Sequence, residues 1–296
     1  GFLRATANGH GLEYADGAPC FLIGDTWWAT PTHRFRWYDD DRQRAIGPEM
    51  GFKDMVRYRK AQGYNCIAMI AAFPNWANDG YPAHLQLPDG SFLRSAWRQA
   101  GTSSAKDMHN EGGRPFLFPG RVPGYEQVFP DIERINPAYF QAMDRKVDYL
   151  NAQGFIPFIE ALRRDGVNVW RDYYGWPEPY ARYLRYLFSR YQAHNVILSP
   201  IHFDFGHATI ASRDFNAPAN AVVAQGIPAF GTLLSCNAAG SSFANFGDAD
   251  EAPWLTLHQI GNRRHHNSHW FLSEIYYESK PPKPALNGEP VYDVMS

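Results

Sequence analysis

Residues 136–162 read NPAYFQAMDRKVDYLNAQGFIPFIEAL and carry the signals of a helix followed by a buried strand. Asn136 is a good helix cap, and Pro137 suits the first turn of a helix because its backbone nitrogen needs no hydrogen bond there. Gly154 ends the helical pattern, and the apolar run after it has the length of a strand. We therefore expect a helix that ends near Gly154 and then a strand that carries a carboxylate, Glu160, near its end.

The same alternation continues in both directions along the chain. Alternation in residues 1–14 and the turn at residues 15–18 predict an entry hairpin. Further helices are predicted from Pro48 to about Gly63 and at residues 178–194, 217–225 and 267–278. Strands are predicted at residues 20–24, 65–71, 155–162, 196–205, 232–236 and 255–260, and from Ala285. Alternating strands and helices imply a parallel sheet with right-handed crossovers.

This pattern of seven strands predicts an α/β fold, the (β/α)8 TIM barrel, with strand eight missing from the sequence. We expect residues 1–296 to form a single catalytic domain that continues beyond residue 296 or is completed by a second chain. Residues 77–135 interrupt the rhythm and are predicted to form a long insertion after strand two. Such connections are usually functional, so this one would wall the active-site face, and a small disordered excursion is the alternative.

The composition excludes several classes of protein. The 296 residues, 45% hydrophobic and 20% charged, suffice for a large folded core. A net charge of −2 with scattered Lys and Arg predicts no nucleic acid partner. No apolar run reaches the roughly 18 residues of a transmembrane helix, so no membrane partner is expected. Cys20, Cys66 and Cys236 are predicted to be buried free thiols, no cofactor is implied, and the oligomeric state is left open.

The aromatic content of 16% is the unusual part of the composition. Aromatic faces stack on the apolar faces of sugar rings, which favours a carbohydrate substrate, although large α/β cores also use many aromatic residues. We expect Trp27, Trp28, Trp76 and Trp254 to line the substrate pocket.

Polar side chains stand near the ends of five predicted strands, where the active sites of (β/α) barrels lie. They are Asp25, Glu160, His202 with Asp204, Asn237, and Glu289. Glycoside hydrolysis uses two carboxyl groups, and strands four and seven face each other across a barrel mouth. We therefore predict Asp204 as acid/base and Glu289 as nucleophile, with carboxyl groups roughly 5 to 5.5 Å apart if the anomeric configuration is retained.

Each of these assignments has an alternative. Glu289 lies between glycine and proline and could be a turn residue bonded to backbone, and Asp204 could cap its loop or pair with Arg213. Glu160 is the reserve acid and otherwise a substrate contact. Asp25 is expected to bind a sugar hydroxyl or to hold the surrounding loops.

Four histidines near the C-terminal end raise the question of a metal site. His265 and His269 share a helical face, but no Glu follows His265 and no third ligand is evident. We therefore predict no metal and a solvated, polar start to a helix that also includes His266. His258 on its strand is the better substrate contact, together with Gln259, His202 and Asn237.

Several segments, taken together and in this order, resemble the apiosidase-like barrels related to glycoside hydrolase family 140. The match spans nearly the whole chain outside the insertion. The segments are Asp16–Trp28, Asn136–Phe140 with Asp144, Ser241–Ser242 with Pro253–Leu255, Gln259–Gly261, and Pro281–Pro284 with Asn287–Tyr292.

The resemblance implies a (β/α)8 glycoside hydrolase with Glu289 as nucleophile and a strand-four carboxylate as acid/base. It also implies action on side chains of plant or algal polysaccharides, frequent export to the periplasm or outside the cell, and a chain that continues past the Gly-Glu-Pro strand. Two departures concern the site. Residues 201–204 read IHFD where relatives commonly have a Gly-Gly-Asp-like end, and Asn237 and Asn262 stand where relatives tend to have histidine. Apiose specificity is therefore not carried over.

The leading hypothesis is a retaining, exo-acting glycosidase. The first alternative is a noncatalytic carbohydrate-binding barrel, which is favoured if strand four presents no carboxylate within reach of Glu289. The second is a polysaccharide lyase that uses His202 and a tyrosine. Cytoplasmic location is the alternative to export.

Overall fold

The computed structural model describes residues 1–72, 84–86, 92–94, 109–127, 129–164, 167–204, 210–261 and 269–289, and the structural statements below refer to these ranges. They belong to two compact units. The first unit contains Gly1–Phe21, Phe158–Arg164 and Tyr180–Ser296, and the second contains Leu22–Pro157 and Asp165–Pro179. Within the described ranges, no helix has both the length and the apolar character needed to span a bilayer.

The first unit opens with a small antiparallel sheet of β1 (Leu3–Ala5), β2 (Leu12–Tyr14) and β3 (Pro19–Cys20). This confirms the expected entry hairpin, whose predicted turn at residues 15–18 connects β2 and β3. The strand predicted at residues 20–24 is corrected, because Cys20 pairs with Leu12 in this sheet. Gly17 lies in the turn between β2 and β3 with a φ of 86°, a backbone conformation that glycine adopts without strain.

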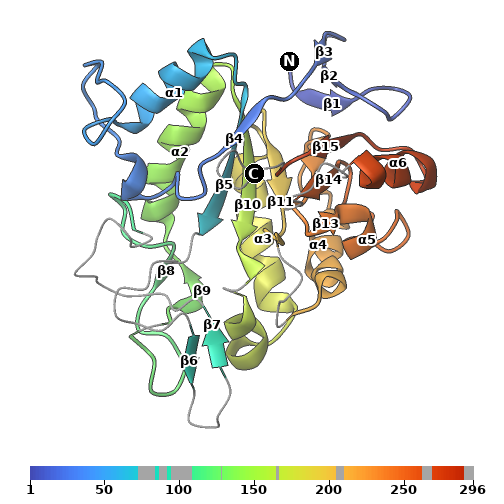
Figure 1. Ribbon diagram of the computed structural model, residues 1–296. Helices are drawn as coiled ribbons and strands as arrows, with labels where there is room; N and C mark the ends of the chain where they lie inside the picture. Colours follow the sequence, from blue (N-terminus) through green and yellow to red (C-terminus); the bar gives the residue numbers. More distant parts are fainter. Residues whose placement is uncertain are drawn as a thin grey trace. The chain divides into compact units, whose positions relative to one another are not determined.

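Three parallel strands form the centre of the first unit. They are β10 (Ile156–Leu162), which begins in the second unit, β11 (Ile197–Ser199) and β12 (Leu233–Leu234). All their residues are buried, as expected for strands covered on both faces. Helix α3 (Glu178–Tyr191) leads to β11 and lies beside the strands in Figure 1, while α4 (Asn216–Val223) leads to β12. The Tyr183 hydroxyl donates to the Ala161 carbonyl at 2.8 Å, which ties α3 to β10.

The C-terminal part of the first unit is a second sheet, drawn in orange to red in Figure 1. Strand β14 (His258–Gly261) pairs antiparallel with β13 (Gly240–Ser241) and parallel with β15 (Ala285–Asn287). Helices α5 (Ser242–Phe246) and α6 (His269–Glu278) contact β14. The short helix α5 was not predicted from the sequence, although its cap is a typical one: Ser241 Oγ accepts the Ala244 N–H at 3.0 Å.

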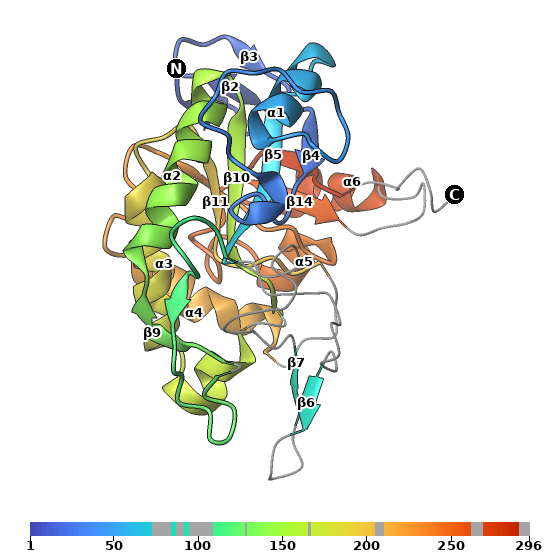
Figure 2. The same cartoon turned by 90° about the vertical axis from the view of Figure 1, so that its left-hand side faces the viewer.

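The second unit contains the parallel pair β4 (Gly24–Thr26) and β5 (Cys66–Ala72). Helices α1 (Phe52–Ala61) and α2 (Pro137–Ala152) contact each other and lie side by side in Figures 1 and 2. Two antiparallel pairs complete the unit: β6 (His84–Gln86) with β7 (Phe92–Arg94), and β8 (Phe116–Leu117) with β9 (Asp131–Ile135). Single helical turns occur at His33–Phe35 and Trp170–Tyr174 here, and at Ser212–Phe215 in the first unit.

Helix α2 begins as predicted, because Asn136 Oδ1 accepts the Ala138 N–H at 3.2 Å and Pro137 occupies the first turn. Its buried Lys146 donates to the carbonyls of Thr30, Thr32 and Phe35 at 2.7, 3.1 and 2.8 Å. Burial lowers the pKa of Lys146 to about 7. This amine fixes the segment that follows β4.

Other predicted boundaries need correction for physical reasons. Helix α1 begins at Phe52 rather than Pro48, because the Asp54 carboxylate accepts the Gly51 N–H at 2.8 Å and so caps the helix there. Strand β11 is shorter than predicted and ends before Pro200, which has no N–H for strand pairing. Strand β14 starts at His258 instead of residue 255.

Six of the seven predicted parallel strands overlap β5, β10, β11, β12, β14 and β15, and the strand predicted at residues 20–24 is displaced to β4, which begins at Gly24. The expected parallel α/β architecture is therefore present. Within the first unit, β12 and β14 belong to different sheets, so the prediction of a closed barrel is not confirmed. The missing eighth strand stays a prediction.

Candidate active site

Glu160 lies near the end of β10, a strand whose seven residues are all buried, and its own exposure is 0%. Its carboxyl group has two partners. Oε2 lies 2.6 Å from His202 Nδ1, and Oε1 accepts the backbone N–H of Asn237 at 3.3 Å. Burial raises the pKa of Glu160 well above its usual range; the Asn237 N–H acts against this effect, and the charge of Glu289 adds to it. Burial therefore favours the neutral, protonated form of this carboxyl group.

His202 follows β11 and is held by the backbone at the end of β10. Its N–H donates to the Leu162 carbonyl at 2.7 Å, and its own carbonyl accepts the Arg164 N–H at 3.0 Å. Burial lowers the pKa of His202 far below its usual range, and the positive charges of Arg163 and Arg164 act in the same direction. The imidazole is therefore neutral.

Asp204 is partly buried and is more accessible than Glu160 and His202, since 15% of its side chain is accessible. Its Oδ2 lies 3.5 Å from His202 Nε2 and 3.4 Å from an Arg163 guanidinium nitrogen, while Arg164 contacts Oδ1. Two cations beside the carboxyl group stabilise its ionised form. The alternative pairing with Arg213 is wrong, because Arg213 contacts Glu251.

Asn237 follows β12 and links this cluster to Glu289. Its amide Nδ2 donates to Glu289 Oε2 at 3.1 Å, and its carbonyl accepts the Phe203 N–H at 2.8 Å. Glu289 lies two residues beyond β15 and is 6% exposed. A continuous series of contacts therefore joins the two predicted catalytic carboxyl groups, Glu289 and Asp204, through Asn237, Glu160 and His202.

Two glycines permit the close approach of side chains in this site. A Cβ at Gly261 would lie 2.3 Å from Asn237 Oδ1, and a Cβ at Gly288 would lie 1.9 Å from Gln259 Oε1. Gln259 is 1% exposed, and its Nε2 donates to Ser235 Oγ at 2.9 Å. These glycines are needed for space and not for an unusual backbone angle.

His258, a predicted substrate contact, lies in a separate buried network. Its ring nitrogens face two hydroxyl groups, Ser242 Oγ at 3.1 Å and Ser279 Oγ at 3.2 Å. Burial lowers the pKa of His258 to about 3, and the charge of Lys283 acts in the same direction. Ser242 Oγ also accepts the Gln259 N–H at 2.9 Å, so this network supports the strand that carries Gln259.

Asp25 and Trp28, two further predicted site residues, lie in the second unit. Asp25 Oδ2 accepts hydrogen bonds from Trp27 Nε1 at 2.8 Å and from Arg59 Nε at 2.6 Å. Such contacts are those expected if Asp25 holds the surrounding loops, which was the alternative to binding a sugar hydroxyl. Trp28 packs against buried residues of the same unit, and Trp76 lies outside the described residues.

Two tryptophans expected to line the pocket lie in the protein core. Trp254 is 1% exposed, its Nε1 donates to Asn216 Oδ1 at 2.8 Å, and its ring packs against Phe246. Trp27 is 4% exposed and stacks on Phe35. Protein atoms cover both rings. The prediction that these two rings contact sugar is therefore corrected, because both pack in the protein core.

Arg163 and Arg164 were not among the predicted site residues, although both contact Asp204. Both arginines directly follow β10. Because the acidic site residues were predicted from their positions at strand ends, the same criterion would also have selected Arg163 and Arg164. Within the described ranges, no three His, Cys, Asp or Glu side chains converge as a metal site would require. His265 and His266 lie outside these ranges, as does the side chain of His269.

Parallel strands that alternate with helices and present carboxyl groups at their ends are the arrangement that (β/α) glycoside hydrolases use. Residues 6–296 match the family described as Apiosidase-like, catalytic domain, and the chain belongs to that family. No curated protein matches the sequence.

Solved structures show the same fold at low sequence identity. A structure described as a glycoside hydrolase matches with a TM-score of 0.56 and 18% identity, over 99% of this chain and 57% of that chain. A glycoside hydrolase family 5 protein from Bacteroides vulgatus ATCC 8482 matches with a TM-score of 0.56 and 18% identity, over 99% of this chain and 54% of that chain. The endo-1,4-beta-mannanase from Rhizomucor miehei matches with a TM-score of 0.56 and 8% identity, over 100% of this chain and 84% of that chain. This chain thus spans little more than half the length of the first two.

Proposed function

We propose that this chain carries the active site of a retaining glycosidase in which Glu289 attacks the anomeric carbon and Asp204 serves as acid and base. The observation that carries the proposal is the series of contacts from Glu289 through Asn237, Glu160 and His202 to Asp204. It links two carboxyl groups of different environment, one beyond β11 and the other beyond β15. Retaining glycosidases need such a pair.

The environments of these carboxyl groups fit the two roles. Glu289 accepts a hydrogen bond from the Asn237 amide, which orients its carboxylate. Asp204 is the more exposed group and contacts a histidine, so a proton can reach it from the protein interior. Family membership supports the reaction class, and structural likeness supports only the fold.

The substrate is proposed from the family resemblance alone. We expect a side-chain sugar of a plant or algal polysaccharide, removed from a chain end, and we expect the protein to be exported. The mannan-degrading neighbour adds β-linked mannosides to the sugars worth testing. The lyase alternative finds no support, because both ring nitrogens of His202 face carboxyl groups inside the protein.

The test is hydrolysis of a panel of 4-nitrophenyl glycosides and plant oligosaccharides, with proton NMR to follow the first product anomer. We expect cleavage with retained configuration and a loss of turnover in Glu289→Gln and in Asp204→Asn. An inverted product would refute the retaining mechanism. Binding of a sugar without cleavage by the wild type would establish the noncatalytic alternative.

A crystal structure with a bound sugar tests the same proposal by geometry. Carboxyl groups of Asp204 and Glu289 about 5 to 5.5 Å apart support retention, and a gap of about 6.5 to 9.5 Å indicates inversion. A gap beyond these ranges would remove Asp204 from the mechanism and leave Glu160 as the candidate acid.

A further inference from the structure

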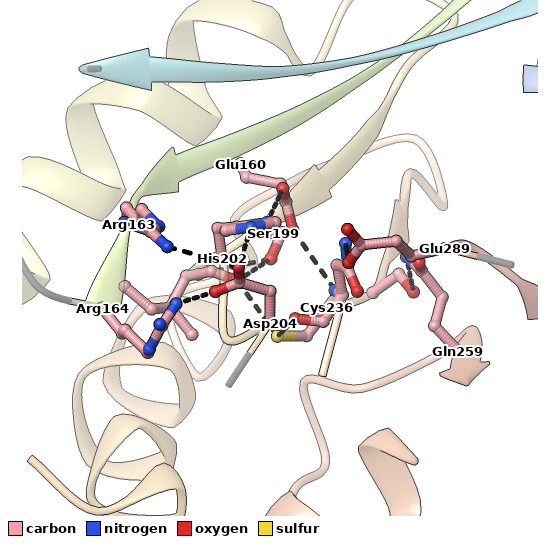
Figure 3. A network of polar contacts seen from close by, with 12 residues as sticks. Glu160, Arg163, Arg164, Ser199, His202, Asp204, Cys236, Gln259 and Glu289 are labelled. Carbon is pink, nitrogen blue, oxygen red and sulfur yellow. Dashed lines mark hydrogen bonds and ion pairs between the residues drawn. The ribbon is translucent and has the colours of Figure 1, made fainter. Parts of the chain in front are cut away.

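Three side chains of the active site form a line that runs from the protein interior to its surface. Glu160 is fully buried, His202 is 1% exposed, and Asp204 is partly accessible. Glu160 Oε2 lies 2.6 Å from His202 Nδ1, and His202 Nε2 lies 3.5 Å from Asp204 Oδ2. Figure 3 shows the imidazole between the two carboxyl groups. Each nitrogen of the ring therefore faces a different acid.

These contacts, together with the neutral form that burial favours for both Glu160 and His202, indicate where the protons lie. A neutral His202 has one ring proton, so one of its nitrogens must accept a hydrogen bond. Protonated Glu160 donates its O–H to Nδ1, which leaves the ring proton on Nε2. That proton points at Asp204, whose negative charge Arg163 and Arg164 stabilise. One transferable proton is thus held on Glu160, and the imidazole is oriented to carry it.

We propose that Glu160, His202 and Asp204 form a proton relay in which Glu160 stores the proton that Asp204 delivers to the departing sugar oxygen. The inference rests on the proposed role of Asp204 as acid and base and names two positioning residues, Glu160 and His202, that act through it. The relay also explains how Asp204 could act as an acid although Arg163 and Arg164 oppose its protonation. Because Asp204 does not hold a proton readily, it must receive one from a neighbouring group during the reaction.

The charge of Glu289 controls when Glu160 releases its proton. Its carboxylate is one of the groups that raise the pKa of Glu160 in the free protein, after burial. When Glu289 bonds to the sugar it becomes a neutral ester, and its charge no longer acts on Glu160. Glu160 therefore becomes a stronger acid in the step that requires a proton. Among the groups that face Glu160, His202 is neutral, Asn237 is uncharged, and burial raises the pKa of the Cys236 thiol.

The two half-reactions balance. In the first, the bond from the anomeric carbon to the leaving oxygen breaks and a bond to a Glu289 oxygen forms. The leaving oxygen takes a proton through Asp204 from His202 Nε2, while the Glu160 proton moves to Nδ1. In the second, water attacks the anomeric carbon and the Glu289 ester bond breaks. The proton of that water passes through Asp204 to Nε2, and the proton on Nδ1 returns to Glu160.

Infrared spectroscopy tests the stored proton without any substrate. A protonated buried carboxyl group gives a carbonyl band that moves in heavy water, and we expect wild type to show it at pH 7 and Glu160→Gln to lose it. Glu289→Gln, which mimics the neutral ester, should keep the band but lose it at a lower pH than wild type. Asp54→Asn is the control. Burial acts to raise the pKa of the Asp54 carboxyl group, but hydrogen bonds from the Arg44 and Gly51 N–H groups outweigh this effect, and the net pKa is lowered. Asp54 is therefore ionised at pH 7, and its replacement should leave the band unchanged.

The band remaining in Glu160→Gln would overturn the proposal, and so would its absence from wild type at pH 7. If Glu160→Gln does not fold, carbon-13 NMR of wild type labelled in its glutamate carboxyl groups gives the same answer. It should show one glutamate that titrates well above the others and that shifts to a lower pH in Glu289→Gln. Identical titrations in the two proteins would overturn the proposed control by Glu289.

Leaving-group dependence tests the relay in turnover, using the methyl and 2,4-dinitrophenyl glycosides of whichever sugar the panel identifies. Dinitrophenolate needs no proton to depart, whereas methoxide does. We expect Glu160→Gln and His202→Gln to slow the methyl glycoside about 100-fold and the dinitrophenyl glycoside less than about threefold, since general acid catalysis contributes 10²-fold or more. Equal losses on both substrates would show a merely structural role. Failure of wild type to cleave any glycoside would refute the proposed function, and the infrared result would still decide where the proton resides.

Discussion

His202 and His258 are both buried in the first unit, but they have different neighbours. His202 lies between two carboxyl groups, those of Glu160 and Asp204, and His258 lies between two hydroxyl groups, those of Ser242 and Ser279. Burial keeps both rings neutral. Serine hydroxyl groups do not ionise near neutral pH, so the His258 network orients groups, whereas the His202 network can also store and move a proton.

The largest expected effect comes from removing the carboxyl groups at the ends of the active-site series. Glu289→Gln and Asp204→Asn should each lower kcat/KM by roughly 10³-fold or more, because the proposed nucleophile and the proposed general acid lose their function. Ser279→Ala removes the outer hydroxyl of the His258 network and should change kcat/KM by less than about threefold. Steady-state kinetics on an unactivated glycoside makes the measurement. A loss in Ser279→Ala equal to that in Glu289→Gln would erase the distinction between the two networks.

The acid sensitivity of folding should be the clearest property of the His258 network. The folded pKa of His258 is about 3, and an unfolded histidine has a value near 6.5. The unfolded chain therefore binds more protons below pH 6.5, and stability is lost as the pH falls toward 3. At pH 4 this loss amounts to about 3 kcal/mol, at roughly 1.4 kcal/mol per pKa unit.

We expect His258→Gln to reduce the difference in unfolding free energy between pH 7 and pH 4 by about that amount, since glutamine does not titrate. Urea unfolding at the two pH values measures it. His10→Gln serves as the control, because His10 is exposed and stacks on Tyr276 at the surface. An unchanged pH difference in His258→Gln would show that the imidazole is not held neutral in the folded protein.

Active sites of (β/α) barrels lie where the strands end, and this principle determined how much of the candidate active site could be predicted from the sequence. Glu160, Asp204, Asn237 and Glu289 were identified because each occurs at or just beyond the end of an apolar run. The contact between Glu160 and His202 was not predictable, because it depends on the register that pairs Glu160 with Ser199 across β10 and β11. A shift of one residue would turn the carboxyl group to the other face.

Aromatic residues show the opposite limit of sequence reasoning. Trp27 and Trp254 have the residue type that stacks on sugars, but type does not determine which way a ring points. In the structure, the Trp254 N–H is bonded to Asn216 and its ring meets Phe246, so the whole side chain serves the core. The fold class followed from periodicity, which is local, whereas burial depends on contacts distant in sequence, such as the 38 positions between Trp254 and Asn216.

Asn237→Ala tests how strongly the active-site series depends on its middle link. The amide donates to Glu289 at 3.1 Å, and hydrogen bonds to charged groups are worth about 1.5 to 3 kcal/mol. We expect a loss of about 10- to 100-fold in kcat/KM, most of it in kcat, because the carboxylate loses its orientation. Thermal unfolding run alongside distinguishes this from a general loss of structure. Full activity in Asn237→Ala would show that Glu289 needs no support from Asn237.

Gly261→Ala applies a milder change to the same link. The added methyl group would lie 2.3 Å from Asn237 Oδ1, so the amide must move away, whereas the backbone of Gly261 needs no positive φ. We expect about a 10-fold fall in kcat and a stability cost of about 1 kcal/mol, at the low end of overpacking effects. Gly24→Ala is the matched control, since its nearest contact, Cys66 Cβ at 3.5 Å, is of ordinary van der Waals length. Equal activity in the two variants would mean that the Asn237 amide can shift without releasing Glu289, and the coupling between these residues would then be looser than their hydrogen bond suggests.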